Sequence, residues 1–277
     1  MEKSQGNFSV IMSVYAGDKA EYLQEAIDSI YANTLLPSEI VLVVDGPVGD
    51  EIRVIVEKYE SKYPDSFRAI RLEKNQGHGN ARRIAMDSAN CEIIAIMDAD
   101  DICVSRRFAL QMNYIQNHPD ISVLGGNIAE FMDNVNNIVG RRIVPNDNEN
   151  IYMYLKYRCP FNQMSVMLKK SDVLSVGGYI DWYCDEDYYL WIRMAEKGYK
   201  FANLPDVLVN VRVGKEMYQR RGGWKYFISE YKLQKYMLEK KIINPLCFVW
   251  NVLLRFLLQV LFPNKLRGFV FQQFARN

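Results

Sequence analysis

The sequence predicts an α/β fold in which a mostly parallel sheet is covered by helices on both faces, in a Rossmann-like arrangement. Strand-like and helix-like patterns alternate from residue 8 to residue 98. The strand-like segments are apolar throughout, which is typical of a parallel sheet that is buried on both faces. Hydrophobic residues make up 49% of the chain and charged residues 24%, a globular balance with ample material for a core.

The first strand and the first helix illustrate the two patterns. Residues 8–14, FSVIMSV, form a continuous apolar run and are predicted to be a buried strand. Residues 21–33 are predicted to form an amphipathic helix, because Leu23, Ile27 and Ile30 recur on one side of it.

The same patterns continue along the chain. We expect further strands at 39–46, 67–73, 92–98, 122–132 and 164–170, and further helices at 50–63, 79–89 and 185–198. From about residue 214 the pattern becomes helical and basic. The chain is therefore expected to consist of a main domain, 1–214, and a C-terminal helical region, 215–277.

Cysteine content and charge restrict the possible environment of the protein. The five cysteines are scattered without a C-x-x-C pair, which argues against a disulfide framework and a zinc site and favours a reducing compartment. The N-terminal residues show no signal-peptide pattern. Residues 215–277 carry twelve Lys and Arg against three Glu, a charge of +9 that leaves −8 for the rest. A basic region on an acidic protein predicts an anionic partner, either nucleic acid or a membrane surface.

Polar residues end three of the buried strands. Ser13-Val14-Tyr15 ends the first strand, Asp45 ends the second, and Asp98 and Asp100 end the strand at 92–98. In parallel α/β sheets, ligands bind beyond the carboxyl ends of the strands. These residues therefore define a candidate site.

The acidic strand end, DADD, predicts a divalent metal ion with a preference for oxygen ligands. Neighbouring carboxylates raise each other's pKa unless a cation neutralises them. Asp98 and Asp100 are too few to enclose the ion, so water and a substrate diphosphate would complete its coordination, as at magnesium sites. The Gly and the distal Glu of an EF-hand are absent. The alternative is a solvated turn in which Asp101 caps the following helix.

Four motifs in order carry a resemblance to a known family. They are SVIMSVYAGDKAEYLQEAIDSI, IVLVVDGP, NQGHGNARRIAMDSANCEIIAIMDADD and GGYIDWYCDEDYYLWIRMAEKG, within residues 8–210. The chain resembles the inverting family 2 glycosyltransferases, which have the A-type nucleotide-sugar-binding fold. More narrowly, it is similar to bacterial capsule, exopolysaccharide and O-antigen enzymes of the amylovoran-transferase kind.

The resemblance implies a role for each motif residue. It assigns nucleotide-sugar binding to Ser13, Val14, Tyr15, Asp45, Gly77, Arg82 and Asp98. Asp98 would contact the ribose and the metal region, and Asp100 would be the principal ligand of Mn²⁺ or Mg²⁺. Arg82 would face the diphosphate or brace the acidic strand end. Because D-x-D sites in this family usually accompany uridine, the implied donor is a UDP-sugar.

The resemblance also implies an acceptor side. Asp187 would be the base that deprotonates the acceptor hydroxyl, with Glu186 beside it. The alternative is that these acidic residues only stabilise the N-terminus of a helix through the helix dipole. Tyr179 and Trp182 would stack on sugar or simply pack in the core. The acceptor would be a polysaccharide or an undecaprenyl-type lipid-linked saccharide.

Departures from the family pattern bear on donor identity. Ser13-Val14-Tyr15-Ala16 replaces the usual Pro-x-Tyr-Asn, Asp45 stands alone instead of in an Asp-Asp pair, and Arg83 replaces a frequent Asn.

The C-terminal region contains an apolar stretch at 246–262, in which Asn251, Arg255 and Gln259 form one polar stripe. It is too short and too polar to span a bilayer, and it fits a helix in the membrane interface. We therefore expect a cytoplasmic protein attached peripherally to the inner face of the cell membrane, and no nucleic-acid binding. The alternative is a helix packed on the main domain or on a second subunit.

Two other functions remain open from the sequence. A nucleotidyltransferase would also combine nucleotide, metal and parallel sheet, but the basic glycine-rich loop expected after its first strand is absent. A non-catalytic protein binding sugar or lipid carrier could use the same fold. The sequence leaves the oligomeric state open.

Overall fold

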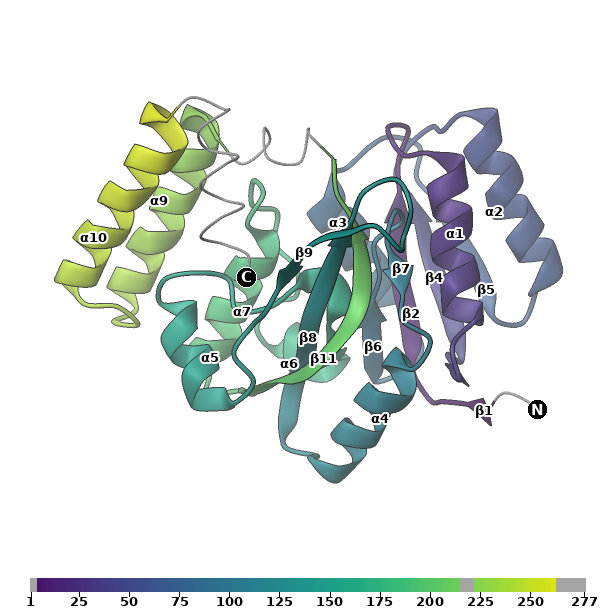
Figure 1. Ribbon diagram of the computed structural model, residues 1–277, viewed down its shortest axis with the longest axis horizontal. Coiled ribbons are helices and arrows are strands. Elements are labelled where there is room, and N and C mark those ends of the chain that lie inside the picture. The colour runs from purple at the N-terminus through teal and green to yellow at the C-terminus, as the bar shows by residue number, and fades with distance from the viewer. Residues whose placement is uncertain (1–3, 215–221, 263–277) are drawn as a thin grey trace.

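The computed structural model describes residues 4–214 and 222–262 (Figure 1). Its strands are β1 Ser4–Gln5, β2 Ser9–Val14, β3 Leu35–Leu36, β4 Glu39–Val44, β5 Phe67–Arg71, β6 Ile93–Ile96, β7 Ile102–Cys103, β8 Ile121–Phe131, β9 Ile138–Arg142, β10 Met167–Lys169 and β11 Lys200–Arg212. Its helices are α1 Ala20–Tyr31, α2 Asp50–Lys62, α3 His78–Ser88, α4 Arg107–Asn117, α5 Asn148–Leu155, α6 Lys170–Ser175, α7 Glu186–Glu196, α9 Trp224–Glu239 and α10 Pro245–Phe256. A π-helical turn, η2 Leu257–Leu261, extends α10.

A mixed sheet in the described part of the chain has the strand order β5-β4-β2-β6-β10-β8-β11-β7, with β9 paired to β8. Strands β5, β4, β2 and β6 are all parallel, as predicted. Their carboxyl ends therefore meet at one edge, and the candidate site residues follow those ends. Strand β10 runs antiparallel to both β6 and β8.

Helices cover both faces of the sheet, which confirms the predicted fold class (Figure 1). Val10, Met12 and Val14 of β2 point into a core shared with α1, α2 and α4. Ile11, between them, points into a second core shared with α3 and α7. This alternation is the two-residue period of a strand whose two faces are both buried.

Strand β11 was not predicted, and it organises the second half of the sheet. It pairs in parallel with β8 along its length, and Asn210 pairs antiparallel with Ile102 of β7. The pairing with β7 holds the chain immediately after the acidic turn. The last residue of β11, Arg212, is thereby brought to that turn.

Helices α9 and α10 lie side by side at the end of the molecule opposite to α2 (Figure 1). Leu233 and Met237 of α9 are buried in the core that contains α7, and the Tyr236 and Tyr189 rings are 5.1 Å apart. Helix α9 is thus packed on the main body of the protein. Of the helices that the structure describes, none has the length and apolarity to cross a bilayer.

Candidate active site

A cavity of about 430 Å³ opens at the carboxyl ends of β2, β4 and β6. It is lined by Ser13, Val14, Tyr15, Asp18, Asp45, Asn75, Gly77, His78, Asp98, Ala99 and Asp100. All the predicted nucleotide-sugar residues except Arg82 therefore lie in one cavity, together with both predicted metal ligands. Asp18, Asn75 and His78 were not predicted to belong to the site. Their proximity in the sequence to Tyr15 and Gly77 was the available signal.

Asp45 fixes the loop that forms one wall of the cavity. Its two carboxylate oxygens accept hydrogen bonds from the backbone N–H groups of Gln76, at 2.7 Å, and Gly77, at 3.0 Å. A side chain on Gly46 would come within 2.5 Å of the Asn75 nitrogen, so the loop can approach only a glycine there. Asp45 therefore has a clear structural role, and its oxygens keep further lone pairs that face the cavity.

Asp98 is paired with a buried arginine. The Arg82 guanidinium, whose side chain is 6% exposed, donates to Asp98 Oδ1 at 2.6 Å and lies 3.5 Å from Glu186 Oε1. Burial alone would raise the pKa of Asp98, but Arg82 and His78 outweigh it and hold that pKa below its ordinary value. Of the two roles predicted for Arg82, the geometry favours bracing the acidic strand end.

Asp100 is exposed to the cavity, and among the described residues no ion pair joins its carboxylate to a cation. Desolvation, together with repulsion from Asp98 and Asp18, raises the pKa of Asp100 to about 6. A divalent cation bound at its carboxylate would remove this repulsion. Hard oxygen donors at the mouth of a cavity are the ligands that Mg²⁺ and Mn²⁺ prefer.

The carboxylates of Asp98 and Asp100 do not form a closed metal site by themselves. Among the residues that the structure describes, no group of three or more His, Cys, Asp and Glu is arranged to hold a metal ion. Two ligands and an adjacent cavity suit an ion whose remaining ligands come from substrate and water. The residues present therefore fit the predicted cofactor.

His78 and Glu186 join helices α3 and α7 beside the cavity. His78 Nδ1 is 3.7 Å from Glu186 Oε1, and His78 Nε2 is 4.0 Å from Asp98 Oδ1. Arg82 lowers the pKa of His78 to about 4, so the imidazole is neutral at pH 7 and these contacts are not ion pairs. Burial, with a contribution from Asp187, raises the pKa of Glu186 to about 6.

Asp187 lies in the first turn of α7, immediately after Glu186. Its Oδ1 accepts from the Tyr188 backbone N–H at 2.6 Å, and its Oδ2 lies 3.9 Å from Cys159 Sγ. Glu186, the residue before it, lies 3.7 Å from His78 Nδ1 and 3.5 Å from Arg82 Nη1 on α3. The start of α7 therefore abuts the start of α3 at the Asp98 side of the cavity.

The two aromatic residues predicted on the acceptor side differ in exposure. Tyr179 is 2% exposed, and its hydroxyl accepts a hydrogen bond from Gln163 Nε2. Tyr179 packs in the core, as the alternative stated for it had it, so the expectation of a sugar-stacking ring is wrong for this residue. Trp182 is half-buried, with its ring centroid 4.4 Å from that of Tyr189.

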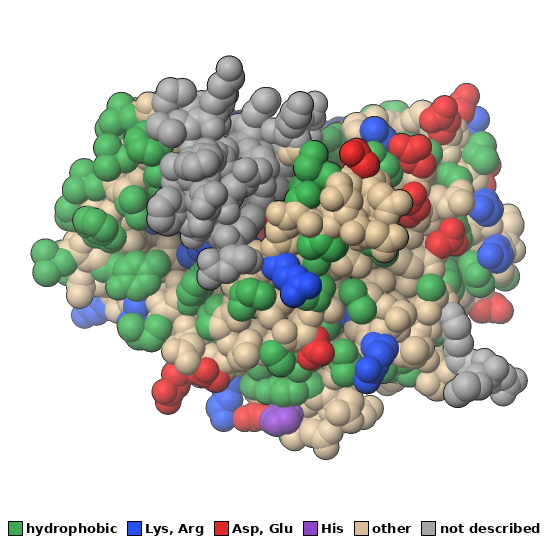
Figure 2. Space-filling model, viewed as in Figure 1, with side chains coloured by type: hydrophobic (Ala, Val, Ile, Leu, Met, Phe, Trp, Pro, Cys, Tyr) green, Lys and Arg blue, Asp and Glu red, His purple; other side chains and the backbone are tan. Residues whose placement is uncertain are grey.

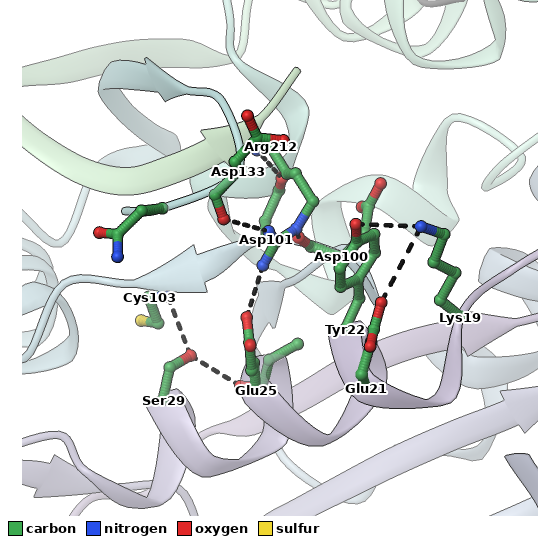
Figure 3. Close-up of polar contacts among 12 residues, drawn as sticks. Lys19, Glu21, Tyr22, Glu25, Ser29, Asp100, Asp101, Cys103, Asp133 and Arg212 are labelled. Atoms are coloured by element: carbon green, nitrogen blue, oxygen red, sulfur yellow. Dashed lines mark hydrogen bonds and ion pairs between the residues drawn. The ribbon is translucent and has the colours of Figure 1, made fainter. Parts of the chain in front are cut away.

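Arg212 ties the acidic turn to helix α1 (Figure 3). Its backbone N–H donates to Asp101 Oδ1 at 2.9 Å, and its Nε donates to the Asp100 carbonyl at 3.2 Å. Its Nη2 donates to Glu25 of α1 at 2.5 Å, and its guanidinium lies 3.8 Å from the Tyr22 ring centroid. These contacts immobilise the backbone that presents Asp100 to the cavity.

The same contacts decide the role of Asp101. Helix α4 begins at Arg107 without a side-chain cap, so the alternative that Asp101 caps this helix is wrong. The reason is that the turn leads first into β7, which places Asp101 against the end of β11 instead.

Two family models match the chain. The model of glycosyl transferase family 2 matches residues 9–174, and that of glycosyl transferase family group 2 matches residues 93–272.

Several curated proteins are similar along their whole length. An uncharacterized glycosyltransferase of Haemophilus influenzae is 39% identical, over 97% of this chain and 99% of its own. The amylovoran biosynthesis glycosyltransferase AmsE of Erwinia amylovora is 34% identical, over 96% and 98%. An Escherichia coli protein named UDP-Gal:alpha-D-GlcNAc-diphosphoundecaprenol beta-1,3-galactosyltransferase is 33% identical, over 100% and 99%.

Solved glycosyltransferases share the fold. S. aureus TarS 1–349 in complex with UDP-GlcNAc superposes with a TM-score of 0.66 at 17% identity, covering 91% of this chain and 73% of TarS 1–349. A mannosyltransferase from Pyrobaculum calidifontis with GDP-Man and Mn²⁺ gives 0.63 at 18% identity, covering 92% and 70%. The chain therefore belongs to glycosyl transferase family 2, and its relatives confirm the predicted resemblance to exopolysaccharide and O-antigen enzymes.

Proposed function

We propose that this glycosyltransferase is metal-dependent and inverting, and that it transfers a hexose from a UDP-sugar to a lipid-linked saccharide during synthesis of a bacterial surface polysaccharide. The observation that carries the proposal is the cavity that joins the Ser13–Tyr15 loop and Asp45 to Asp98 and Asp100. The names of the E. coli galactosyltransferase and of the TarS complex support a uridine donor.

The donor lies along the strand ends in this proposal. Ser13, Val14, Tyr15 and Asp45 contact the base and the ribose, and Gly77 lets the backbone approach the nucleotide. Asp98, held by Arg82, contacts both the ribose and the metal region. Asp100 is the principal ligand of Mn²⁺ or Mg²⁺, which when bound supplies Lewis-acid stabilisation of the leaving nucleoside diphosphate.

Asp187 is the base of the reaction. An acceptor hydroxyl oxygen forms a bond to the anomeric carbon while the bond from that carbon to the diphosphate oxygen breaks. Asp187 takes the hydroxyl proton, and the electron pair of the broken bond leaves with the nucleoside diphosphate. Attack from the face opposite to the leaving group inverts the anomeric carbon. Glu186 and the half-buried Trp182 lie on this acceptor side.

The nature of the acceptor bears on whether the protein is attached to a membrane. The E. coli relative's name specifies a diphosphoundecaprenol-linked acceptor, and its chain is aligned over its full length. A polysaccharide intermediate on such a carrier is held at a membrane. We therefore propose that the enzyme works in the cytoplasm at the inner face of the cell membrane, attached peripherally through residues 215–277.

Nucleotide binding can be tested by thermal shift with a panel of nucleoside diphosphates and nucleotide sugars, each with Mn²⁺ or with a chelator. A ligand that binds only the folded protein adds about 2.7 kcal/mol to the free energy of unfolding at a hundredfold excess over its Kd. This added stability raises the melting temperature. We expect a Mn²⁺-dependent shift with UDP and UDP-sugars. A folded protein that responds to no nucleotide would contradict the proposed donor site.

Arg212 is expected to position Asp100. A lysine cannot reproduce the contacts that the planar guanidinium makes with Asp100, Glu25 and Tyr22. Residues that orient a metal ligand typically contribute about 10–100-fold to metal affinity or activity, so Arg212→Lys should raise the Mn²⁺ concentration for half-maximal activity by that factor. Arg53→Lys, at an exposed arginine of α2, is the control. An unchanged Mn²⁺ requirement in Arg212→Lys would remove the positioning role.

A further inference from the structure

Helix α10 and the turn η2 have an inverted distribution of polar and apolar side chains. An exposed row recurs every three or four residues and contains Leu246, Val249, Trp250, Leu253, Leu254 and Leu257. Leu246 is 82% exposed and Trp250 63%. A surface helix of a globular protein normally buries such a row and exposes its polar side.

The polar stripe of the same helix faces the protein. Asn251 Nδ2 donates to Gln234 Oε1 of α9 and to the Lys156 carbonyl, each at 2.8 Å. Arg255 pairs with the buried Glu230 of α9 and also donates to the Tyr157 carbonyl at 2.8 Å. The helix was expected to lie in the membrane interface, or alternatively to pack on the main domain or on a second subunit, and the sequence left open which of its sides would face the protein. The structure places the polar stripe against the protein, and this leaves the apolar row outside.

Helix α9 extends the exposed apolar row. Trp224, Ile228 and Tyr231 are exposed on one side of α9, and the Trp224 ring centroid is 6.1 Å from that of Phe256 on α10. Lys232 and Lys235 follow Ile228 and Tyr231 by four residues each, so they continue the same rows on the helix surface. Aromatic, aliphatic and basic side chains are thus combined on one face, which we name the α9–α10 face.

Figure 2 shows hydrophobic side chains gathered over α10 at the left edge of the molecule, with basic side chains below them. Contiguous exposed apolar surface of this kind marks an interaction site. Helices that lie in a bilayer interface combine Trp and Leu with Lys and Arg in this way, and basic residues favour anionic headgroups.

We propose that the α9–α10 face docks into the interface of an anionic bilayer. In this arrangement α10 lies in the membrane plane, its apolar row contacts the lipid, and its buried polar stripe binds α10 to the rest of the protein. This inference rests on the proposed membrane attachment for its partner and names the surface that makes it. Charge favours lipid over a second copy of the chain. Residues 222–262, which include α9 and α10, carry six Lys and Arg against two Glu, a net charge of +4. A symmetric dimer would bring two such basic regions together, whereas an anionic surface complements their charge.

Vesicle co-sedimentation of the full-length protein tests the face. The vesicles contain either phosphatidylcholine alone or phosphatidylcholine mixed with phosphatidylglycerol. We expect the wild type to bind the anionic vesicles, more weakly as salt is raised, and the double variant Trp250→Glu/Leu253→Glu to bind at least tenfold more weakly. Leu246→Glu, at the most exposed residue of the row, is a second and milder variant. The matched control is Val54→Glu, at an apolar residue of α2 that is 57% exposed and lies at the other end of the molecule (Figure 1).

The outcomes separate this inference from the proposed function. If the wild type binds no vesicles, both the face and the membrane attachment are wrong. Equal binding by the wild type and both α10 variants would keep the attachment and overturn the face. A wild-type dimer that the variants abolish, without vesicle binding, would assign the face to a second copy. The nucleotide-induced thermal shift of the variants, which should equal that of the wild type, reports the donor site and the folded state independently.

Discussion

Asp187→Asn is expected to lower kcat by a factor of about 10² to 10⁴, the usual contribution of a general base. Asparagine keeps the size and the hydrogen-bonding shape of the side chain but cannot accept the acceptor proton. Binding of the donor should not change, because Asp187 does not line the cavity that is proposed to hold the nucleotide. Initial rates of sugar transfer, together with the Mn²⁺-dependent thermal shift, separate the two quantities.

Asp50→Asn provides a control for the alternative role of Asp187. Asp50 also lies in the first turn of a helix, α2, where it is exposed. Loss of a carboxylate at either helix N-terminus should cost about 0.3–1 kcal/mol of stability through the helix dipole. Only Asp187→Asn should also lose turnover. If both variants retain full kcat, Asp187 only stabilises the N-terminus of α7 through the helix dipole, and another residue must be the base.

Asp100→Asn is expected to abolish metal-dependent nucleotide binding and to lower the rate of transfer by about 10²-fold or more. Lewis-acid stabilisation by a metal contributes several kcal/mol, and each 1.36 kcal/mol is a factor of ten in rate. The measurement is the thermal shift with UDP and Mn²⁺, compared with UDP and chelator. In the wild type the two should differ, and in the variant they should coincide.

The metal-free protein gives an internal check of this prediction. Asp98 and Asp18 repel the ionised Asp100, so the neutral asparagine should leave the melting temperature without metal unchanged or higher. A variant that melts well below the wild type in chelator would show that Asp100 has a structural role. A variant that keeps the full Mn²⁺-dependent shift would rule out Asp100 as the principal ligand.

Some relations in this protein are local and can be inferred from the sequence. The apolar runs around Ile11 and Ile94 predicted buried strands, because a strand covered on both faces has no polar side. Their parallel direction then placed Asp45, Asp98 and Asp100 at one edge. The order of motifs predicted the family, which the family models confirm.

Other relations depend on segments that are distant in the chain. Tyr179 was as consistent with an exposed stacking residue as with a core residue, and only its neighbours bury it. The contact of Arg212 with the Asp100 carbonyl spans 112 residues and depends on the unpredicted strand β11.

Helix α10 shows most clearly which properties follow from the local sequence and which depend on the tertiary structure. The sequence by itself determined that 246–262 contains a polar and an apolar side, because the spacing of Asn251, Arg255 and Gln259 follows the helical repeat. It did not determine which side faces the protein. Only the tertiary structure decided this, because Glu230, Gln234 and the carbonyls after α5 offer buried partners that the polar stripe must satisfy. The apolar side is left exposed in the part of the chain that the structure describes.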